Sequence, residues 1–302
     1  MIKNKLKKWY YFIEKKYSIL LCKISCKMAS KRLYKKILKK NINLDNPKTF
    51  NEKLMKLKLE NYNFNENVFK CSDKYLVRDY VKKLGVSNKS LPRLIKTYEF
   101  ANEINIDELP NKFVLKCSHG YGFNIVCKDK SKFNIDDAKR KLAKWKKTKF
   151  GYASCETHYT HVTPTIFAEE YIEGEDGKFP NDYKIYCFNG IPKLVLVCSE
   201  REESLKLNFF DLEWKELEKI GKDSFRNKEL PSKPKHLDEM IRIAKKISKE
   251  FPFVRVDFYE YKDNVYLGEM TFTPACCAAN YYTEYGDEYL GSLLDIGEKN
   301  EK

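Results

Sequence analysis

Two acidic residues near the carboxyl end of the chain have the spacing of a metal-binding pair. Asp257 lies in residues 253–261, where apolar and polar side chains alternate as in a strand with one buried face. Glu269 lies in the next such segment, 265–273. A three-residue turn centred on Asp263 would place the two carboxylates opposite each other, with Cβ atoms roughly 4.5–5.5 Å apart. Such a pair suits Mg²⁺, although a solvated hairpin with ordinary surface charges would have the same pattern.

A lysine that precedes a glycine-containing loop forms a second group. Lys116 lies in the apolar run 112–117, which predicts a short strand, and His119-Gly120-Tyr121-Gly122-Phe123-Asn124 follows it. Two glycines at i and i+2 let backbone N–H groups approach a phosphate, and the lysine adds a positive charge. The run matches neither a Walker A loop nor a complete Rossmann motif. A tight turn beside a surface lysine would explain it equally well.

An acidic strand end forms the third group. Residues 165–171 predict a strand that leaves the interior, and the acids Glu169, Glu170 and Glu173 gather at its end. Carboxylates at such a place can bind a ribose hydroxyl or an adenine amine. A solvent-exposed strand end would look the same.

The elements that must position these groups mix helices and strands without a regular βαβ alternation. This mixture favours an α+β domain with a mainly antiparallel sheet. Asn189-Gly190 predicts a hairpin turn between two of the strands. Helices are predicted at 50–59, 73–84, 134–147 and 238–250, and strands at 91–98, 112–117, 165–171, 182–188, 193–199, 207–211, 253–261 and 265–273.

The positive charge of the chain is concentrated at its amino end. Residues 1–40 hold 14 Lys or Arg and a single acid, Glu14, whereas the remainder is close to neutral. A nucleic-acid-binding enzyme would carry basic surface on its folded body as well, so a nucleic-acid partner is not expected. Apolar residues recur in this segment near a helical period, with too many lysines for a spanning helix or a signal peptide. An amphipathic helix on an anionic membrane fits, and so does a helix packed on the domain with a lysine-rich solvated face.

The cysteines and histidines do not predict a metal site. None of the ten cysteines forms a paired CxxC motif, and several lie in apolar runs, which indicates a reducing, cytosolic protein. His158 and His161 have the i, i+3 spacing of zinc ligands, but Cys155 is the only other such ligand near them in the sequence.

The three groups occur in one order along the chain: lysine and glycine loop, acidic strand end, carboxylate pair. In this order the sequence resembles the ATP-grasp superfamily, and more closely the TupA-like ATP-grasp family, named for teichuronopeptide synthesis. Beyond the basic helical segment, which the charge pattern places at 1–45, the resemblance implies an ATP-grasp domain at 46–300, divided into subdomains 46–168 and 169–300. It is carried by 49–54, 73–81, 113–124, 168–171, 182–190, 208–214 and 251–274.

The resemblance implies a role for each matching residue in binding ATP. Lys74 and Lys116 would hold the phosphates, and residues 119–124 would form a mobile loop over them. The adenine would lie against the segment Glu169-Glu170-Tyr171-Ile172, and Glu173 would take the ribose hydroxyls.

The resemblance also implies the metal site and the catalytic groups. Asp257 and Glu269 would bind Mg²⁺, with Thr271 where many ATP-grasp enzymes have a metal-binding Asn. Arg255 would stabilise the transferring phosphoryl group, and Lys184 is a further candidate for phosphate binding.

The activity implied is that of a carboxylate–amine ligase, which would use ATP to join an amino acid to a carboxylate-bearing surface glycan near the inner face of the plasma membrane. A glycan kinase, a glycosyltransferase and a non-catalytic membrane-associated scaffold are the alternatives. The sequence departs from the family pattern at Tyr121 and Phe123 in the loop, and at Ala-Cys-Cys-Ala after Pro274. These departures bear on loop mobility and on the acceptor side of the site.

Overall fold

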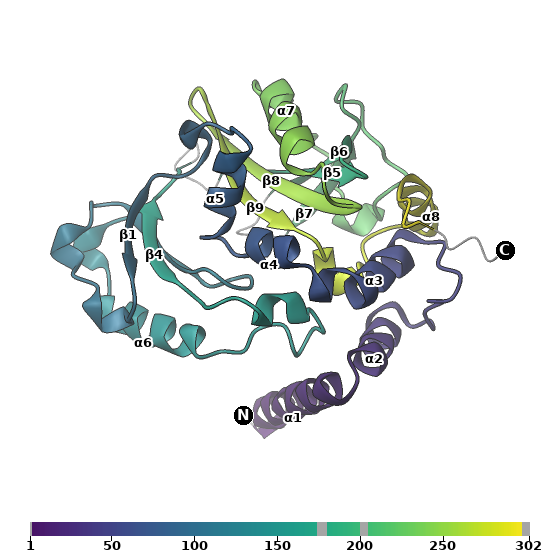
Figure 1. Ribbon diagram of the computed structural model, residues 1–302, viewed down its shortest axis with the longest axis horizontal. Helices are drawn as coiled ribbons and strands as arrows, with labels where there is room; N and C mark the ends of the chain where they lie inside the picture. The colour runs from purple at the N-terminus through teal and green to yellow at the C-terminus, as the bar shows by residue number, and fades with distance from the viewer. Residues whose placement is uncertain (1, 174–179, 200–204, 298–302) are drawn as a thin grey trace.

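The computed structural model describes residues 2–173, 180–199 and 205–297, with the backbone alone at residues 2–6 and 8 (Figure 1). The last residues of the predicted domain, 298–300, lie outside the described part. Two antiparallel sheets, each with its own hydrophobic core, form the body of the protein, and two helices project from it at the amino end.

The smaller sheet has four strands in the order β1-β4-β2-β3. Each neighbouring pair is antiparallel. Helix α6 (Ile135–Lys146) packs its apolar face on this sheet and shares a core with β2 and β4. The strands are β1 (Leu94–Tyr98), β2 (Phe113–Cys117), β3 (Asn124–Cys127) and β4 (Ile166–Glu170).

The larger sheet has five strands in the order β7-β6-β5-β8-β9, again all antiparallel. Strands β5 and β8 lie at its centre, and every residue of β5 is buried. The strands are β5 (Asp182–Phe188), β6 (Ile191–Ser199), β7 (Lys206–Phe210), β8 (Phe253–Tyr261) and β9 (Asn264–Thr271).

Helices from both ends of the chain cover the larger sheet. Phe50, at the start of α3, packs edge to face on Phe253 of β8, with ring centroids 4.9 Å apart. Thr49 and Glu52 form a capping box that fixes where α3 begins, as the sequence predicted. The helices of this core are α3 (Phe50–Glu60), α4 (Glu66–Ser72), α5 (Val77–Lys83), α7 (Leu237–Ile247) and α8 (Glu284–Leu293).

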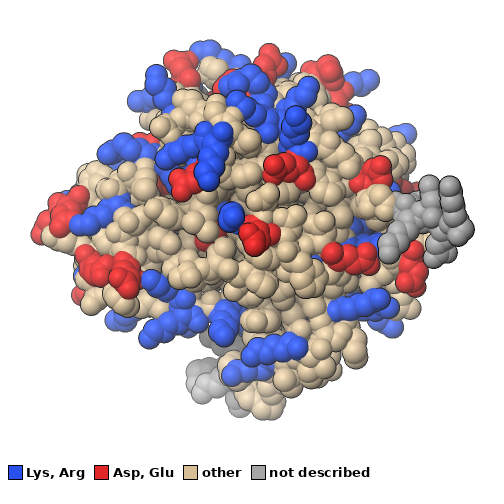
Figure 2. All heavy atoms as spheres, in the orientation of Figure 1, with Lys and Arg blue, Asp and Glu red and all other residues tan. Residues whose placement is uncertain are grey.

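The basic amino-terminal segment forms two helices rather than one. Helix α1 (Ile2–Ile24) is followed by Ser25, which caps α2 (Cys26–Leu38) by accepting a hydrogen bond from the Met28 amide. The lowest part of the face in Figure 2, where these helices lie in Figure 1, shows basic and uncharged atoms. Within the described residues, no helix has the length and apolar character needed to cross a bilayer.

The α+β architecture and its antiparallel sheets confirm the predicted fold class, with two local differences. The helix expected at 73–84 begins only at Val77, because the Asp73 carboxylate accepts the amides of Tyr75 and Leu76 and holds a turn there. The expected subdomain boundary at 168/169 falls inside β4, and helices α3 to α5 share the core of the larger sheet.

Candidate active site

A cleft between the two sheets brings several of the predicted site residues together. Its walls come from β2, β3 and β4 of the smaller sheet, from β8 and β9 of the larger sheet, and from the start of α5. One part of the wall is apolar and another is charged. The residues that line it include Lys74, Arg78, Val114, Lys116, Asn124, Val126, Glu169, Glu170, Tyr171, Ile172, Tyr259, Leu267 and Gly268.

Asp257, Glu269 and Lys184 form one row across three neighbouring strands. Asp257 is the ladder partner of Glu269 on β9, as predicted, and of Lys184 on β5. The Lys184 ammonium contacts the Asp257 carboxylate and lies 2.6 Å from Asp182. Cross-strand neighbours on one face of a sheet are close enough to interact directly. The register thus explains why residues far apart in the sequence share one site.

The hairpin reaches this register by a different route from the one predicted. Tyr261 pairs with Asn264, so the turn contains two residues, and Lys262 adopts a left-handed conformation with φ 52°. Strand β9 then contains one extra residue, Gly268, between Leu267, which pairs with Phe258, and Glu269, which pairs with Asp257. A side chain at Gly268 would place its Cβ 2.7 Å from the Tyr259 ring. The expected three-residue turn is therefore wrong, whereas the expected pairing is correct because the bulge shifts the register by one residue.

Arg255 links the carboxylates to Thr271 on the same face of the hairpin. Its Nε donates to Asp257 Oδ1 and its Nη2 to Asp257 Oδ2, both at 2.7 Å. Nη2 also donates to Thr271 Oγ1 at 3.0 Å and lies 3.4 Å from Glu269 Oε1. Thr271 in turn donates to Glu269 at 3.1 Å. Thr271 therefore orients the predicted metal ligand Glu269 as well as lying beside it.

Positive side chains surround the two carboxylates. Burial raises the pKa of Glu269, but the charges of Lys74, Lys184 and Arg255 outweigh it and lower the pKa to about 2. Glu269 is hence ionised at neutral pH, and cations already lie beside both carboxylates. Mg²⁺ prefers such oxygen donors, usually one or two carboxylates completed by phosphate and water. The oxygen donor set fits a magnesium site.

Lys74 is held in the cleft by a turn before α5. Its ammonium donates to the Gly120 carbonyl and lies 3.8 Å from Glu269. Its own amide donates to the Ser118 carbonyl at 2.9 Å, and Ser118 Oγ donates to the neighbouring Asp73 carboxylate. Burial and the nearby charge of Lys116 lower the pKa of Lys74 despite the carboxylates near it. Lys74 therefore connects the glycine loop to the metal-site carboxylates.

Lys116 and Arg78 both bind Glu169. The Lys116 ammonium contacts Glu169 Oε1, and Arg78 Nη1 lies 3.5 Å from Oε2. Arg78 also donates to the Pro92 carbonyl. The sequence reasoning missed Arg78, since nothing in its own helix indicated that it would face a strand about ninety residues later. It also missed Asp182, whose i, i+2 spacing from Lys184 was the available signal.

The glycine loop is anchored by aromatic side chains. Gly120 has φ +70°, and a Cβ there would lie 2.5 Å from the Phe150 ring. Tyr121 and Phe123 both pack edge to face on Phe150. Phe123 also stacks on Trp145, with centroids 5.1 Å apart. The bulky residues that depart from the family pattern thus form the packing that holds this loop.

His119 and Asn124 have different environments within the same loop. The His119 ring is buried, which lowers its pKa, and its Nε2 donates to the Thr148 carbonyl at 2.9 Å. Asn124 opens β3 opposite Lys116 and lines the cleft. Gly122 has φ +73° with open space around it. The predicted contacts of His119, Gly120 and Gly122 with ATP phosphates stay predictions.

The segment after β4 presents backbone and apolar side chains to the cleft. Glu170 accepts the Arg93 amide at 2.8 Å, so its carboxylate holds a neighbouring chain segment. Tyr171 and Ile172 line the cleft beside Val114, Val126 and Leu267. Glu173 is not among the lining residues; its carboxylate pairs with Lys112 at 2.6 Å. The adenine and ribose roles of these residues stay predictions.

The sequence pattern of one family matches most of this chain. The TupA-like ATP-grasp family matches residues 52–295, which include both sheets and every residue of the cleft. The chain belongs to the TupA-like ATP-grasp family. Membership confirms the predicted family and its ATP-grasp fold.

Solved structures are also similar to this TupA-like ATP-grasp protein, at low identity and low TM-score. A D-alanine–D-alanine ligase from Bacillus anthracis, solved with ATP, is 15% identical over 68% of this chain and 56% of its own, with a TM-score of 0.41. The ATP-grasp ligase PsnB, solved with Mg and ADP, is 12% identical over 78% and 58%, with a TM-score of 0.38. The chain thus spans less than two thirds of either structure. Among curated proteins, none matches it.

Proposed function

We propose that this protein is an ATP-dependent carboxylate–amine ligase that couples an amino acid to a carboxylate-bearing surface glycan or its precursor. The observation that carries the proposal is the row of Lys184, Asp257 and Glu269, which ends 3.8 Å from the cleft-lining Lys74, at Glu269. The row combines metal-binding carboxylates with cations suited to phosphate. The glycan substrate rests on the family's link to teichuronopeptide synthesis.

The cleft offers separate surroundings for the two ends of ATP. Apolar Val114, Val126 and Leu267 lie near the backbone of 170–172, where an adenine ring would bury its faces. Lys74 and Lys116 lie on the charged wall, within reach of the glycine loop. We infer that the base lies at the first place and the phosphates at the second.

The reaction needs no nucleophilic side chain. A substrate carboxylate oxygen attacks the γ-phosphorus, the bond to the ADP oxygen breaks, and the acyl phosphate so formed reacts with an amine to release phosphate and a proton. Lys74, Lys184 and Arg255 stabilise the negative charge on the transferred group. The cleft between the sheets limits hydrolysis of the acyl phosphate by excluding water.

Asp257 and Glu269 would hold magnesium, with Thr271 and Arg255 orienting their oxygens. When bound, the ion supplies Lewis-acid stabilisation of the phosphate oxygens. Lys184 and Arg255 both pair with Asp257, so they hold its carboxylate in a fixed orientation. These contacts assign the two cations a positioning role in addition to phosphate binding.

The test of this function is a product analysis with defined substrates. The full chain is incubated with MgATP, uronic acids or uronate-containing oligosaccharides, and a panel of amino acids, and ADP and product mass are measured. A ligase gives ADP and an adduct that has lost one water, only when acid and amine are both present. Hydroxylamine in place of the amine gives a hydroxamate.

Asp257→Asn is the control for this experiment, because it removes one carboxylate charge from the row while preserving size. Loss of both ADP and adduct is expected. A phosphorylated glycan without amide would instead indicate a kinase, and glycosyl transfer without ADP would indicate a glycosyltransferase. Failure of MgATP to bind in calorimetry would contradict any ATP-dependent reaction at this site.

We further propose that α1 contacts an anionic membrane surface on the cytoplasmic side. Trp9, Phe12 and Leu20 are 64%, 59% and 58% exposed, although large apolar side chains usually avoid water. Lysines lie between them in the sequence. A helix with aromatic residues and many lysines binds anionic bilayers by apolar burial together with charge attraction.

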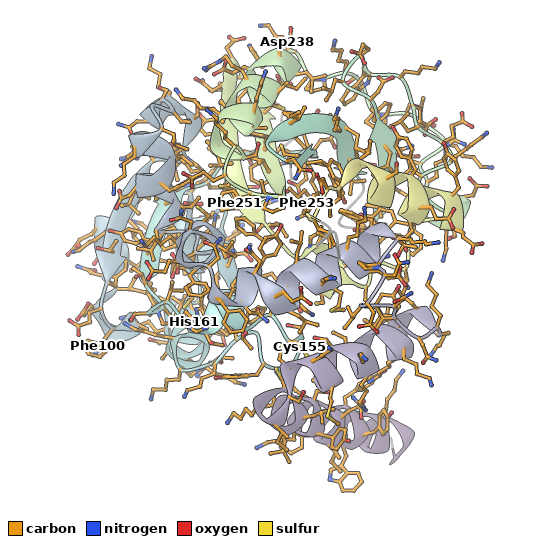
Figure 3. All side chains as sticks on the ribbon, turned by 45° about the vertical axis from the view of Figure 1, so that its right-hand side comes forward. Phe100, Cys155, His161, Asp238, Phe251 and Phe253 are labelled. Carbon is orange, nitrogen blue, oxygen red and sulfur yellow. The ribbon has the colours of Figure 1, made fainter. Side chains whose placement is uncertain are left out.

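Vesicle flotation tests this membrane contact. The full chain should float with phosphatidylcholine vesicles that contain phosphatidylserine, and much less with phosphatidylcholine alone. Replacing both Trp9 and Phe12 with Glu should abolish flotation. Phe100→Glu is the matched control, because Phe100 is similarly exposed, at 56%, but lies on the smaller-sheet subdomain, far from α1 (Figure 3). Equal flotation of the double variant and the wild type would contradict the proposal.

A further inference from the structure

Three cysteine side chains meet where the amino-terminal helices join the body. Cys22 lies in the last turn of α1, Cys26 opens α2, and Cys155 lies in the loop after α6, labelled in Figure 3 beside the amino-terminal helices. Their sulfur atoms all lie within 4.8 Å of one another. In the described part of the chain, this is the only group of three His, Cys, Asp or Glu side chains with ligand atoms so close.

We propose that Cys22, Cys26 and Cys155 bind a structural zinc ion that fastens α1 and α2 to the ATP-grasp body. Tetrahedral zinc takes thiolates at about 2.3 Å, which places sulfur atoms roughly 3.8 Å apart. The three sulfurs need only a small closure to reach that spacing. Cys22 and Cys155 are buried, and Cys26 is half-buried, so the site is closed as structural zinc sites are.

The groups around the sulfurs match those that support a metal–thiolate centre. Asn63 Nδ2 donates to Cys26 Sγ at 3.6 Å, which stabilises negative charge on that sulfur. Lys58 is fully buried, and its ammonium has no hydrogen-bond partner among the described residues. Three thiolates around a divalent ion leave one negative charge, and a buried ammonium nearby compensates it. Lys58, which already interacts with the Glu156 carboxylate, would then face this second negative charge once the site is filled.

His158 is the candidate for the fourth ligand, and it must move to reach the ion, because its ring nitrogens do not lie within 4.8 Å of all three sulfurs. Its Nδ1 lies 3.4 Å from Asn63 Oδ1, an amide oxygen that can only accept, so the proton resides on Nδ1. The Nε2 lone pair is then available, and this buried atom has no partner in the described part of the chain. In zinc-binding histidines, one ring nitrogen usually binds the metal and the other donates its N–H to an oxygen acceptor. Asn63 thus connects Cys26 and His158 in one network.

This site could not be found by spacing alone. Cys22 and Cys26 belong to different helices, and Cys155 follows more than a hundred residues later. Cys155 precedes His158 and His161, for which the sequence indicated no complete set of zinc ligands. His161 takes no part, because its ring stacks on Phe69 with centroids 4.2 Å apart. The inference is independent of the proposed ligase chemistry, since none of these residues lines the cleft.

Metal analysis of the intact chain tests the site. The full chain, purified without chelator and after zinc loading, should hold one zinc per molecule after desalting. Cobalt in place of zinc should give thiolate-to-metal charge-transfer absorption and the intense visible bands of tetrahedral coordination. Alkylation followed by mass spectrometry should show Cys22, Cys26 and Cys155 protected with zinc and reactive after chelation, whereas Cys276 reacts equally in both states.

Single variants then identify the ligands. Cys22→Ser, Cys26→Ser and Cys155→Ser should each weaken zinc binding on the order of 100-fold, and His158→Asn should weaken it by about 10- to 100-fold. Cys71→Ser, at a buried thiol outside the cluster, is the matched control and should bind zinc as the wild type does. The alkylation experiment uses the wild type, so its result does not depend on whether any variant folds. Absence of the charge-transfer band, unprotected thiols in the presence of zinc, or a disulfide within the cluster after aerobic purification and zinc loading would each overturn the proposal.

Discussion

Arg255 holds Asp257 through two parallel hydrogen bonds, from Nε to Oδ1 and from Nη2 to Oδ2, each 2.7 Å long. Both residues lie on the same face of β8, separated by Val256, which is buried in the core. The guanidinium is planar and matches a carboxylate with two donors, which a lysine cannot do. The pair therefore fixes the orientation of the metal-site carboxylate before any ligand arrives.

The bidentate pair predicts that Arg255→Lys impairs catalysis although it preserves charge. We expect ATP turnover to fall by about 100-fold, because the variant loses the second donor to Asp257 and the bond to Thr271. Initial rates of ADP release measure this effect. Arg242→Lys is the matched control, since Arg242 makes a similar fork with Glu239 on the exposed face of α7. Equal rates for both variants would contradict the positioning role.

The two loop glycines predict a contrast between matched alanine variants. Gly120→Ala combines a positive φ with a Cβ 2.5 Å from the Phe150 ring, whereas Gly122→Ala has a similar φ and open space. Gly122→Ala should lower the free energy of unfolding by roughly 1 kcal/mol through backbone strain alone. Gly120→Ala should cost more and displace the carbonyl that Lys74 binds.

Urea unfolding and the KM for ATP measure these two effects. A larger KM for Gly120→Ala than for Gly122→Ala is expected, because only the first change disturbs the link to Lys74. If the two variants were equally stable, the packing of Phe150 against Gly120 would not constrain the loop.

The depressed pKa of Glu269 predicts how its contribution to stability varies with pH. Its folded pKa of about 2 lies below the usual 4.5, so its charge stabilises the fold fully above about pH 4.5. This stabilisation is lost as the pH falls from 4.5 towards 2, when the carboxylate protonates. The difference in unfolding free energy between the wild type and Glu269→Gln should shrink over that window. Urea titrations from pH 7 to pH 3 measure it, and a difference that stays constant would contradict the ion-pair assignment.

The turn after β9 predicts a stabilising substitution. Ala275, Cys276 and Cys277 have φ of 49°, 57° and 62°. This left-handed conformation is unfavourable for residues that carry a Cβ. Ala275 is exposed, so Ala275→Gly relieves strain without removing buried packing. We expect the free energy of unfolding to rise by about 1 kcal/mol. Ala278→Gly, a buried neighbour with negative φ, should instead destabilise the protein, and denaturant unfolding distinguishes the two.

Much of the cleft could be predicted from local patterns. Alternation along 253–261 placed Arg255 and Asp257 on one face, since successive side chains of a strand point to opposite sides. The glycine loop and Lys116 could be recognised because their spacing lies within one turn and strand. The pairing of Asp257 with Glu269 was also predicted, although through a turn of the wrong length.

Contacts between distant segments could not be predicted in this way. The bulge at Gly268 restores the pairing of Asp257 with Glu269. Gly268 lies tightly against the Tyr259 ring of the neighbouring strand, and the spacing of residues in the sequence does not reveal this contact. Arg78 meets Glu169, and Cys22 meets Cys155, only because two sheets and the amino-terminal helices pack in one arrangement. Periodicity and turn chemistry act over a few residues, so the sequence indicates which side chains share a face. Which faces meet depends on how the two hydrophobic cores bury their surfaces, a property of the whole chain.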